Sequence, residues 1–290
     1  MTLISFCTLT LDSERRSLLV GQQDFLLDWN ISEFQSPAVD ALKVAVDHRI
    51  GGVLVFWSPF STGKTTALKD MVRSMQLDGR TAIYLDAARR TEQNYQRFAD
   101  WLSDHLGIPS NVQYDDHFKT RQSGNRTVIV IDHFERLLHF PDTSSEVVNL
   151  GRISYESRTD HFRIVLAVSR SKLVLQILDW NGKQKLRLAC APEAARWNAS
   201  YMRRYALSLE EVNALEESEK EGVIRMASEG GSVALVLHLV NLDQSVGQKK
   251  LDSEILAWQT GADDLKDLDY YPAPRSTEQT HHQKGRPLTA

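Results

Sequence analysis

The sequence predicts an α/β fold, with three αβα layers around a mostly parallel sheet and a helical lid at the C-terminal end. Four apolar runs, several rich in β-branched residues, alternate with amphipathic stretches of helical period. This alternation is typical of strand–helix–strand units joined by right-handed crossovers. The alternation stops near residue 190, and from Pro192 onward the pattern is helical.

The α/β part begins with a helix, expected over residues 37–48 because Val39, Leu42 and Ala45 recur at helical spacing. Residues 127–131 form a continuous β-branched run, which indicates a parallel strand covered on both faces. The strands are expected at 53–57, 81–86, 127–131 and 162–168, and the helices between them at 67–77, 92–106 and 144–157.

The C-terminal part is expected to contain helices at 193–205, 208–215, 219–228, 232–242 and 250–259. Ser208 with Glu211 three residues later has the spacing of a capping box. We expect an N-terminal extension over 1–36, the α/β core over 37–190, the helical lid over 191–260 and a tail over 261–290. The tail has too little apolar content to offset its ordering entropy, so we expect it to be flexible.

Composition excludes few functions. The net charge of -4 gives no whole-chain signal for nucleic acid or an anionic membrane, and no stretch is long and apolar enough to span a bilayer. Cys7 and Cys190 lie far apart and read as reduced thiols. We therefore expect a cytoplasmic protein, with a nuclear location as an alternative.

The most specific motif follows the first strand. An apolar run ends at Trp57, a turn-prone loop follows, and Gly63-Lys64-Thr65 then opens a helical pattern. In that order a buried strand delivers a loop whose N–H groups surround phosphate oxygens at a helix N-terminus. Lys64 would reach the β- and γ-phosphates, and Thr65 would bind Mg²⁺. The residues expected around the nucleotide are Ser58, Pro59, Phe60, Ser61, Thr62, Gly63, Lys64, Thr65 and Thr66.

Ser58 stands where the phosphate-loop pattern G-x-x-x-x-G-K-[ST] has its first glycine. That glycine eases a tight turn, so the exchange weakens the match without removing a phosphate ligand. A chance Gly-Lys-Thr at a helix start is the alternative, since such residues are common at N-caps. The flanking strand and helix favour the nucleotide site.

A second motif lies at the end of the third strand, where Asp132 and Glu135 follow the apolar run. The carboxyl ends of parallel strands form the edge where such sheets bind ligands. There Asp132 can reach the Mg²⁺ shell, and Glu135 can polarise the water that attacks the γ-phosphate. The alternatives are an ordinary turn or cap for Asp132, and His133 as the base.

Together these motifs resemble the additional-strand, catalytic-Glu class of P-loop NTPases, and within it the AAA+ and STAND ATPases. The resemblance covers about residues 37–245 and implies a sheet in which one strand separates the phosphate-loop strand from the Asp132 strand. It implies that Ser169 senses the γ-phosphate, and that Gly230 and Gly231 lie in a lid turn. The candidates for an arginine finger are Arg152, Arg158 and Arg170, each of which is also an ordinary surface arginine.

The resemblance implies an enzyme that binds and hydrolyses ATP with Mg²⁺, with Lys64, Asp132, Glu135 and Ser169 as catalytic residues and Thr65 and Asp132 as metal ligands. Hydrolysis would drive a conformational change acting on a protein or nucleic-acid partner, with a homo-oligomer possible and no membrane partner. The alternative is a switch module gated by ATP or ADP that hydrolyses slowly or not at all. Phosphoryl transfer to a small molecule is a third reading, which Glu135 disfavours.

Overall fold

The computed structural model describes residues 38–47, 53–59, 62–88, 95–109, 112, 117, 127–156, 162–180, 187–189, 197–230, 236, 239 and 244–266. The expected N-terminal extension, Phe60 and Ser61 of the loop, and residues 267–290 of the tail lie outside this part of the chain. Within it, no helix is long and apolar enough to cross a membrane.

The sheet has the order β2-β3-β4-β1-β5, and each pairing in it is parallel. Its strands are β1 (Val53–Trp57), β2 (Thr81–Asp86), β3 (Thr127–Asp132), β4 (Phe162–Val168) and β5 (Arg187–Leu188). The first four confirm the predicted ranges, and β4 separates β1 from β3 as expected. The two-residue β5 was not predicted, since so short a segment leaves no periodic signal.

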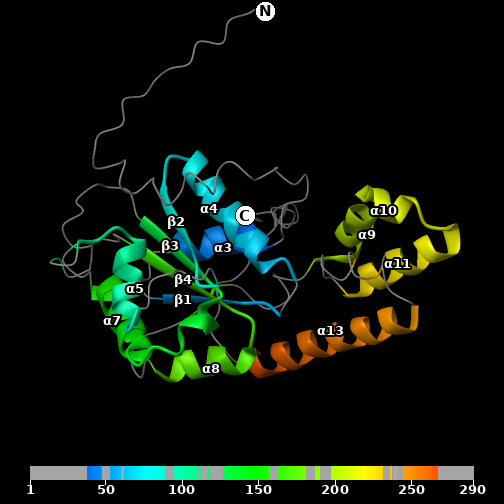
Figure 1. Cartoon of the computed structure of the whole chain (residues 1–290). Coiled ribbons are helices and arrows are strands. Elements are labelled where there is room, and N and C mark those ends of the chain that lie inside the picture. The colour runs from blue at the N-terminus through cyan, green and yellow to red at the C-terminus, as the bar shows by residue number, and fades with distance from the viewer. Residues whose placement is uncertain are drawn as a thin grey trace, which may run out of the picture.

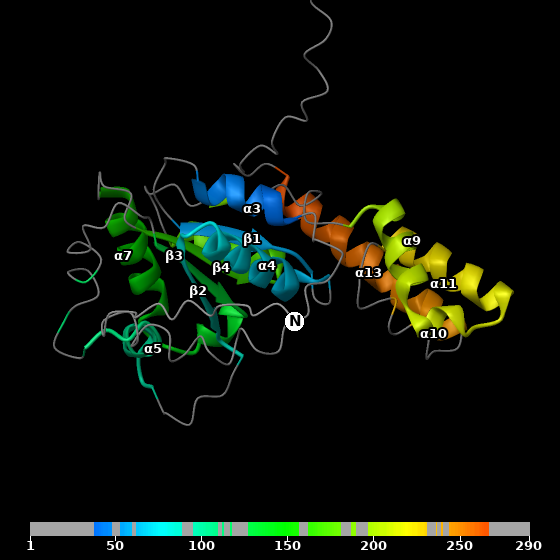
Figure 2. The ribbon, with the colours of Figure 1, turned by 90° about the horizontal axis from the view of Figure 1, so that it is seen from above.

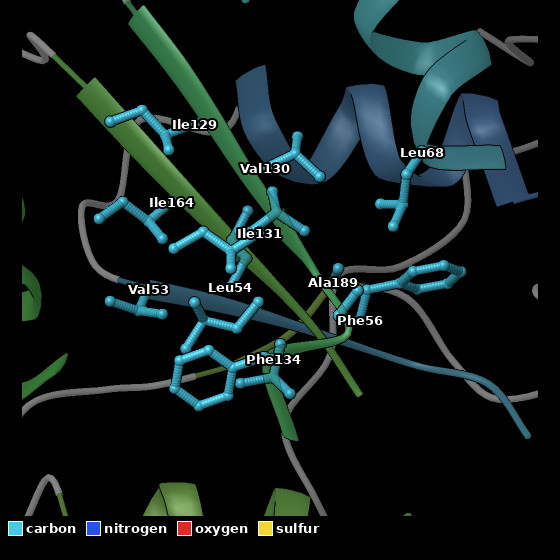
Figure 3. Close-up of a cluster of buried hydrophobic side chains, with 14 of the residues drawn as sticks. Val53, Leu54, Phe56, Leu68, Ile129, Val130, Ile131, Phe134, Ile164 and Ala189 are labelled. Carbon is cyan, nitrogen blue, oxygen red and sulfur yellow. The ribbon is translucent and has the colours of Figure 1, made fainter. Parts of the chain in front are cut away.

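Helices cover both faces of the sheet, which confirms the three-layer arrangement (Figures 1 and 2). On one face α3 (Ala38–Asp47) packs against α4 (Lys64–Leu77), and α4 contacts β2 and β3. The other face carries α5 (Phe98–His105), α7 (Thr143–Glu156) and α8 (Ser171–Asp179). The residues of β1, β3 and β4 are buried throughout, and their side chains meet Leu68 and Phe134 in the core (Figure 3).

Two helices of the α/β core differ from the prediction. Among the described residues of the expected helix 92–106, α5 begins only at Phe98, because Arg97 is extended and Asp142 accepts the N–H groups of Phe98 and Ala99 at 2.7 and 3.2 Å. That cap comes from a distant segment, so local spacing cannot reveal it. Helix α8 was missed, although Leu173, Val174 and Ile177 bury one face at helical spacing.

The C-terminal helices build a second hydrophobic cluster. They are α9 (Ala199–Ser208), α10 (Glu210–Asn213), α11 (Glu217–Gly230) and α13 (Gln244–Leu265). The predicted capping box is wrong, because Ser208 ends α9 and donates to the carbonyl of Tyr205, while Leu209 occupies the N-cap position of α10. The cluster contains Trp197, Met202, Ala206, Val212, Val223, Ile224, Met226, Ala227, Val236, Leu239 and Leu251.

Helix α13 contacts both α11 and α8, and it runs from the C-terminal helices to the sheet (Figure 1). Leu251 near its start belongs to the second cluster, whereas Trp258 and Leu265 belong to the core around the sheet. The expected boundary between lid and tail at residue 260 therefore falls inside a helix. The prediction of a flexible tail is wrong for residues 261–265, which belong to α13. Packing explains the difference, since the buried positions of α13 alternate in steps of four and three: Gly247, Leu251, Glu254, Trp258, Gly261 and Leu265.

Candidate functional site

The loop between β1 and α4 reverses the chain at the C-terminal edge of the sheet. Ser58 N donates to Val168 O at 3.3 Å, which continues the pairing of β1 with β4 by one residue. Gly63 has a φ of 84°, in the left-handed region that a residue without Cβ adopts without strain. Helix α4 begins directly after it at Lys64, with Thr65 and Thr66 in its first turn. The N-terminal N–H groups of α4 therefore lie at this edge, where a helix end stabilises an anion.

Ser58 takes part in the structure of the loop. Its hydroxyl is hydrogen-bonded to the hydroxyl of Thr62, and Thr62 Oγ1 donates to Pro59 O at 2.9 Å. Ser58 and Thr62 are both buried. The residue that departs from the phosphate-loop pattern thus adds a hydrogen bond across the loop.

Lys64 reaches across the sheet edge to the end of β4. Its Nζ donates to Ser169 Oγ at 2.8 Å, and the residue is 7% exposed. Burial lowers the pKa of Lys64, and the nearby carboxylates of Asp132 and Glu135 oppose that shift without cancelling it. A cation that is desolvated to this degree gains from any anion placed beside it, which is the role expected of a phosphate-binding lysine.

Asp132 ends β3 with its carboxylate fully buried. Its Oδ2 accepts from Thr65 Oγ1 at 2.6 Å and from Tyr84 OH at 2.8 Å, and its Oδ1 accepts from His133 N at 2.8 Å. The hydroxyl and carboxylate oxygens of Thr65 and Asp132 are the hard donors that Mg²⁺ prefers. The described residues hold no cluster of three or more His, Cys, Asp or Glu that could bind a metal ion.

Glu135 lies in the short helix η1 (Phe134–Leu137), just beyond Asp132. Its Oε1 accepts the backbone N–H of Ser169, so Glu135 meets Lys64 at the same residue. Ser169 is thus in contact with two of the predicted catalytic residues.

His133 adopts φ 53°, the only positive φ that the described part of the chain shows outside glycine. Its Nδ1 lies 3.0 Å from Asp86 Oδ1 and 3.7 Å from Asp132 Oδ2. The ring is thereby paired with the acid that ends β2. Tyr84 and Asp86 were missed in the sequence, although an acid at the end of a strand paired with β3 was a usable signal, since Asp86 and Asp132 are register partners.

The other predicted residues are less closely placed. Arg152 is exposed on α7 and donates to Asn149 Oδ1 at 2.8 Å. Arg170 directly precedes α8 and lines a hollow of about 570 Å³ between the phosphate loop and α13. Ser171 and Asp264 also line that hollow, and Ser171 Oγ donates to Asp264 Oδ2 on α13 at 2.6 Å. Gly230 ends α11, whereas Arg158 and Gly231 lie outside the described residues.

Trp197 was also missed as a site residue. Its indole Nε1 donates to Thr62 O at 3.1 Å, from a position 135 residues further along the chain. No local signal pointed to this contact, because a buried tryptophan before a helix is usually only part of a core.

No protein-family model matches the chain, and no curated protein matches it significantly. Solved structures of similar fold include domain III of the replication initiation protein DnaA of Thermotoga maritima, at 13% identity and a TM-score of 0.43 over 77% of this chain and 89% of that one. A Walker-type ATPase of Pyrococcus abyssi is 14% identical, with a TM-score of 0.46 over 79% and 74%. AMPPCP-bound DnaA from Aquifex aeolicus is 17% identical, with a TM-score of 0.44 over 82% and 66%. Likeness at this level concerns the fold alone, so the function has to be inferred from the side chains of this chain.

Proposed function

We propose that the protein binds and hydrolyses ATP with Mg²⁺, as an ATPase of the AAA+ or STAND type, and uses the reaction to change the shape that it presents to a macromolecular partner. The observation that supports this is the convergence of Lys64, Thr65, Asp132, Glu135 and Ser169 at one edge of the sheet. They come from the start of α4, the end of β3, the short helix η1 and the residue after β4. Hydrogen bonds join Ser169 to Lys64 and Glu135, and a separate one joins Thr65 to Asp132; the two groups meet at the adjacent residues Lys64 and Thr65.

In this proposal the loop amides and Lys64 hold the phosphates. The N–H groups at the start of α4 and the Lys64 ammonium would neutralise the β- and γ-phosphate oxygens. Nucleotide would then add negative charge beside Lys64, whose desolvation the carboxylates of Asp132 and Glu135 offset only in part. Thr65 and Asp132 would hold Mg²⁺, which supplies charge neutralisation on the phosphates. Tyr84 donates to Asp132 and fixes the orientation of its carboxylate.

Glu135 would act as the base that orients the attacking water and accepts its proton as the bond to phosphorus forms. Ser169 would read the γ-phosphate, because its hydroxyl accepts from Lys64 and its N–H donates to Glu135. A phosphate that draws Lys64 away from Ser169 also changes the surroundings of the base. This arrangement links occupancy of the site to the position of the catalytic carboxylate.

The second candidate is a nucleotide-gated switch with slow or no hydrolysis. One contact favours it: the Glu135 carboxylate accepts the Ser169 N–H, so a γ-phosphate that shifts Ser169 would move this carboxylate without any hydrolysis. In this case bound ATP or ADP selects a conformation, and the partner reads that conformation. A cytoplasmic location, a protein or nucleic-acid partner and a homo-oligomer belong to either proposal.

The test is phosphate release with ATP and Mg²⁺, with bound nucleotide measured in parallel. Lys64→Ala is expected to lose tight ATP binding, and Glu135→Gln is expected to keep binding and lose turnover. The matched controls are the exposed residues Lys249 and Glu216, whose Lys249→Ala and Glu216→Gln variants should behave as wild type. Retained nucleotide without turnover in the wild type would favour the switch, and wild type that binds no nucleotide would exclude both.

A further inference from the structure

Trp197 connects the second hydrophobic cluster to the phosphate loop. The residue is 4% exposed, and its ring packs in the second cluster with an edge contact to Tyr201 at 5.9 Å between ring centroids. From that position its Nε1 donates to the backbone carbonyl of Thr62 at 3.1 Å. An indole has only this one donor, and here it is given to the loop.

The contact fixes a peptide plane in the loop. The bond between Thr62 and Gly63 is trans, so its C=O and its N–H point in opposite directions. A carbonyl of Thr62 that is held toward Trp197 therefore aims the N–H of Gly63 away from Trp197. Gly63 precedes the first residue of α4, and its N–H is among the donors that a phosphate loop presents to phosphate oxygens. Without the indole, this plane could turn and expose a carbonyl in place of a donor.

The side chain of Thr62 contacts the first residues of the loop, Ser58 and Pro59. Its hydroxyl donates to Pro59 O at 2.9 Å and is hydrogen-bonded to Ser58. The carbonyl of Pro59 is thus engaged by a side chain of the loop itself, and the carbonyl of Thr62 is engaged by Trp197 from outside the loop. Thr62 is the common member of both contacts.

We propose that Trp197 and Thr62 are positioning residues, which hold the phosphate loop in the shape that receives the nucleotide before the nucleotide arrives. The inference rests on the proposed nucleotide site and adds the residues that preorganise it. Preorganisation lowers the cost of binding without touching the reacting atoms. Loss of either residue should therefore raise Kd and KM for ATP and leave kcat unchanged.

The first experiment compares Trp197→Phe with Trp101→Phe. The replacement keeps an aromatic ring and removes the indole donor. Trp101 is equally buried at 4% exposure, but it lies on α5 and packs against Phe98 and His105. By calorimetric titration with ATP and Mg²⁺, Trp197→Phe should weaken binding about fivefold to thirtyfold, the effect of leaving one buried carbonyl without its donor. Trp101→Phe should bind ATP as wild type does.

The second experiment compares Thr62→Val with Thr143→Val, and it decides the matter should Trp197→Phe fail to fold. Both threonines are buried, and both donate to a backbone carbonyl, at 2.9 Å from Thr62 to Pro59 and at 2.6 Å from Thr143 to Leu137. Their stability losses should be similar, as measured by unfolding without nucleotide. Only Thr62→Val should weaken ATP binding and raise KM at constant kcat.

The outcomes separate the two proposals. Wild type that binds no ATP would overturn the proposed function and this inference with it. Wild type that binds ATP, with Lys64→Ala defective and both Trp197→Phe and Thr62→Val normal, would overturn the inference alone. A fall in kcat that tracks the loss of folded protein, with KM unchanged, would also overturn it, because that pattern belongs to a purely structural role.

Discussion

Gly261 lies where α13 passes closest to the end of β1. A Cβ placed on Gly261 would stand 1.9 Å from Cζ2 and 2.3 Å from Cη2 of Trp57. Real carbon atoms do not approach so closely, so Gly261→Ala forces either the indole or the helix to move. The indole also contacts Trp258 of the same helix, in an edge contact at 5.5 Å between ring centroids. The displacement therefore spreads into the packing of α13 on the core.

The expected cost follows from two opposing effects. Overpacking a well-filled core costs about 1–3 kcal/mol, while alanine in place of glycine inside a helix returns up to about 1 kcal/mol. We expect Gly261→Ala to lower the free energy of unfolding by about 1–2 kcal/mol. Gly222 in α11 is the matched control, since nothing lies within 4 Å of a Cβ built there. Gly222→Ala should raise stability by about 0.5–1 kcal/mol.

The assay is urea unfolding followed by far-ultraviolet circular dichroism, in the absence of nucleotide. The same chemical change should have opposite signs at the two sites. If Gly261→Ala proved as stable as Gly222→Ala, the close approach of α13 to Trp57 would be refuted.

Two further variants test the site itself. Burial lowers the pKa of Lys64 in the folded protein below its ordinary 10.5. At pH values between the folded-state pKa and the unfolded-state pKa, the unfolded chain binds more protons than the folded protein. The free energy of unfolding therefore rises with pH in that range. Lys64→Met removes this desolvated amine, so it should raise the melting temperature of the nucleotide-free protein at pH 7. It should also make the melting temperature less dependent on pH. A melting temperature below that of the wild type would contradict the desolvation of the amine. Tyr84→Phe removes one hydrogen bond to Asp132 and should raise the Mg²⁺ concentration for half-maximal phosphate release about tenfold. The exposed change Glu210→Gln should leave that concentration unaltered, and equal Mg²⁺ requirements of wild type and Tyr84→Phe would remove Tyr84 from the site.

Much of the fold could be predicted because its strands leave a strong local signal. The continuous apolar run of β3, bounded by polar residues, admits few interpretations other than a buried parallel strand. Among the predicted site residues, Asp132 ends β3 and Ser169 directly follows β4, while Lys64 opens α4 and Glu135 lies in η1. Their catalytic roles stay predictions. Ser169 contacts Lys64 and Glu135, whereas Asp132 is joined to Thr65, the neighbour of Lys64.

The missed features depend on contacts between distant segments. The cap of α5 comes from Asp142, and the donor to the phosphate loop comes from Trp197, neither of which local spacing can reveal. The length of α13 is a different case, because Leu251, Trp258 and Leu265 recur every seven residues and could have predicted the longer helix. The polar composition of 261–290 concealed that signal.

With 22 residues, α13 is long enough for a small tilt at one end to displace the other end by several ångströms. At 1.5 Å per residue the helix spans about 33 Å, and its C-terminal half rests on Trp57, the residue that leads into the phosphate loop. A tilt of about 10° at Gly261 displaces the Gln244 end by about 4 Å at this rise per residue. Leu251 ties that end to the second cluster, so a small tilt of α13 beside Trp57 would move that cluster by a larger distance.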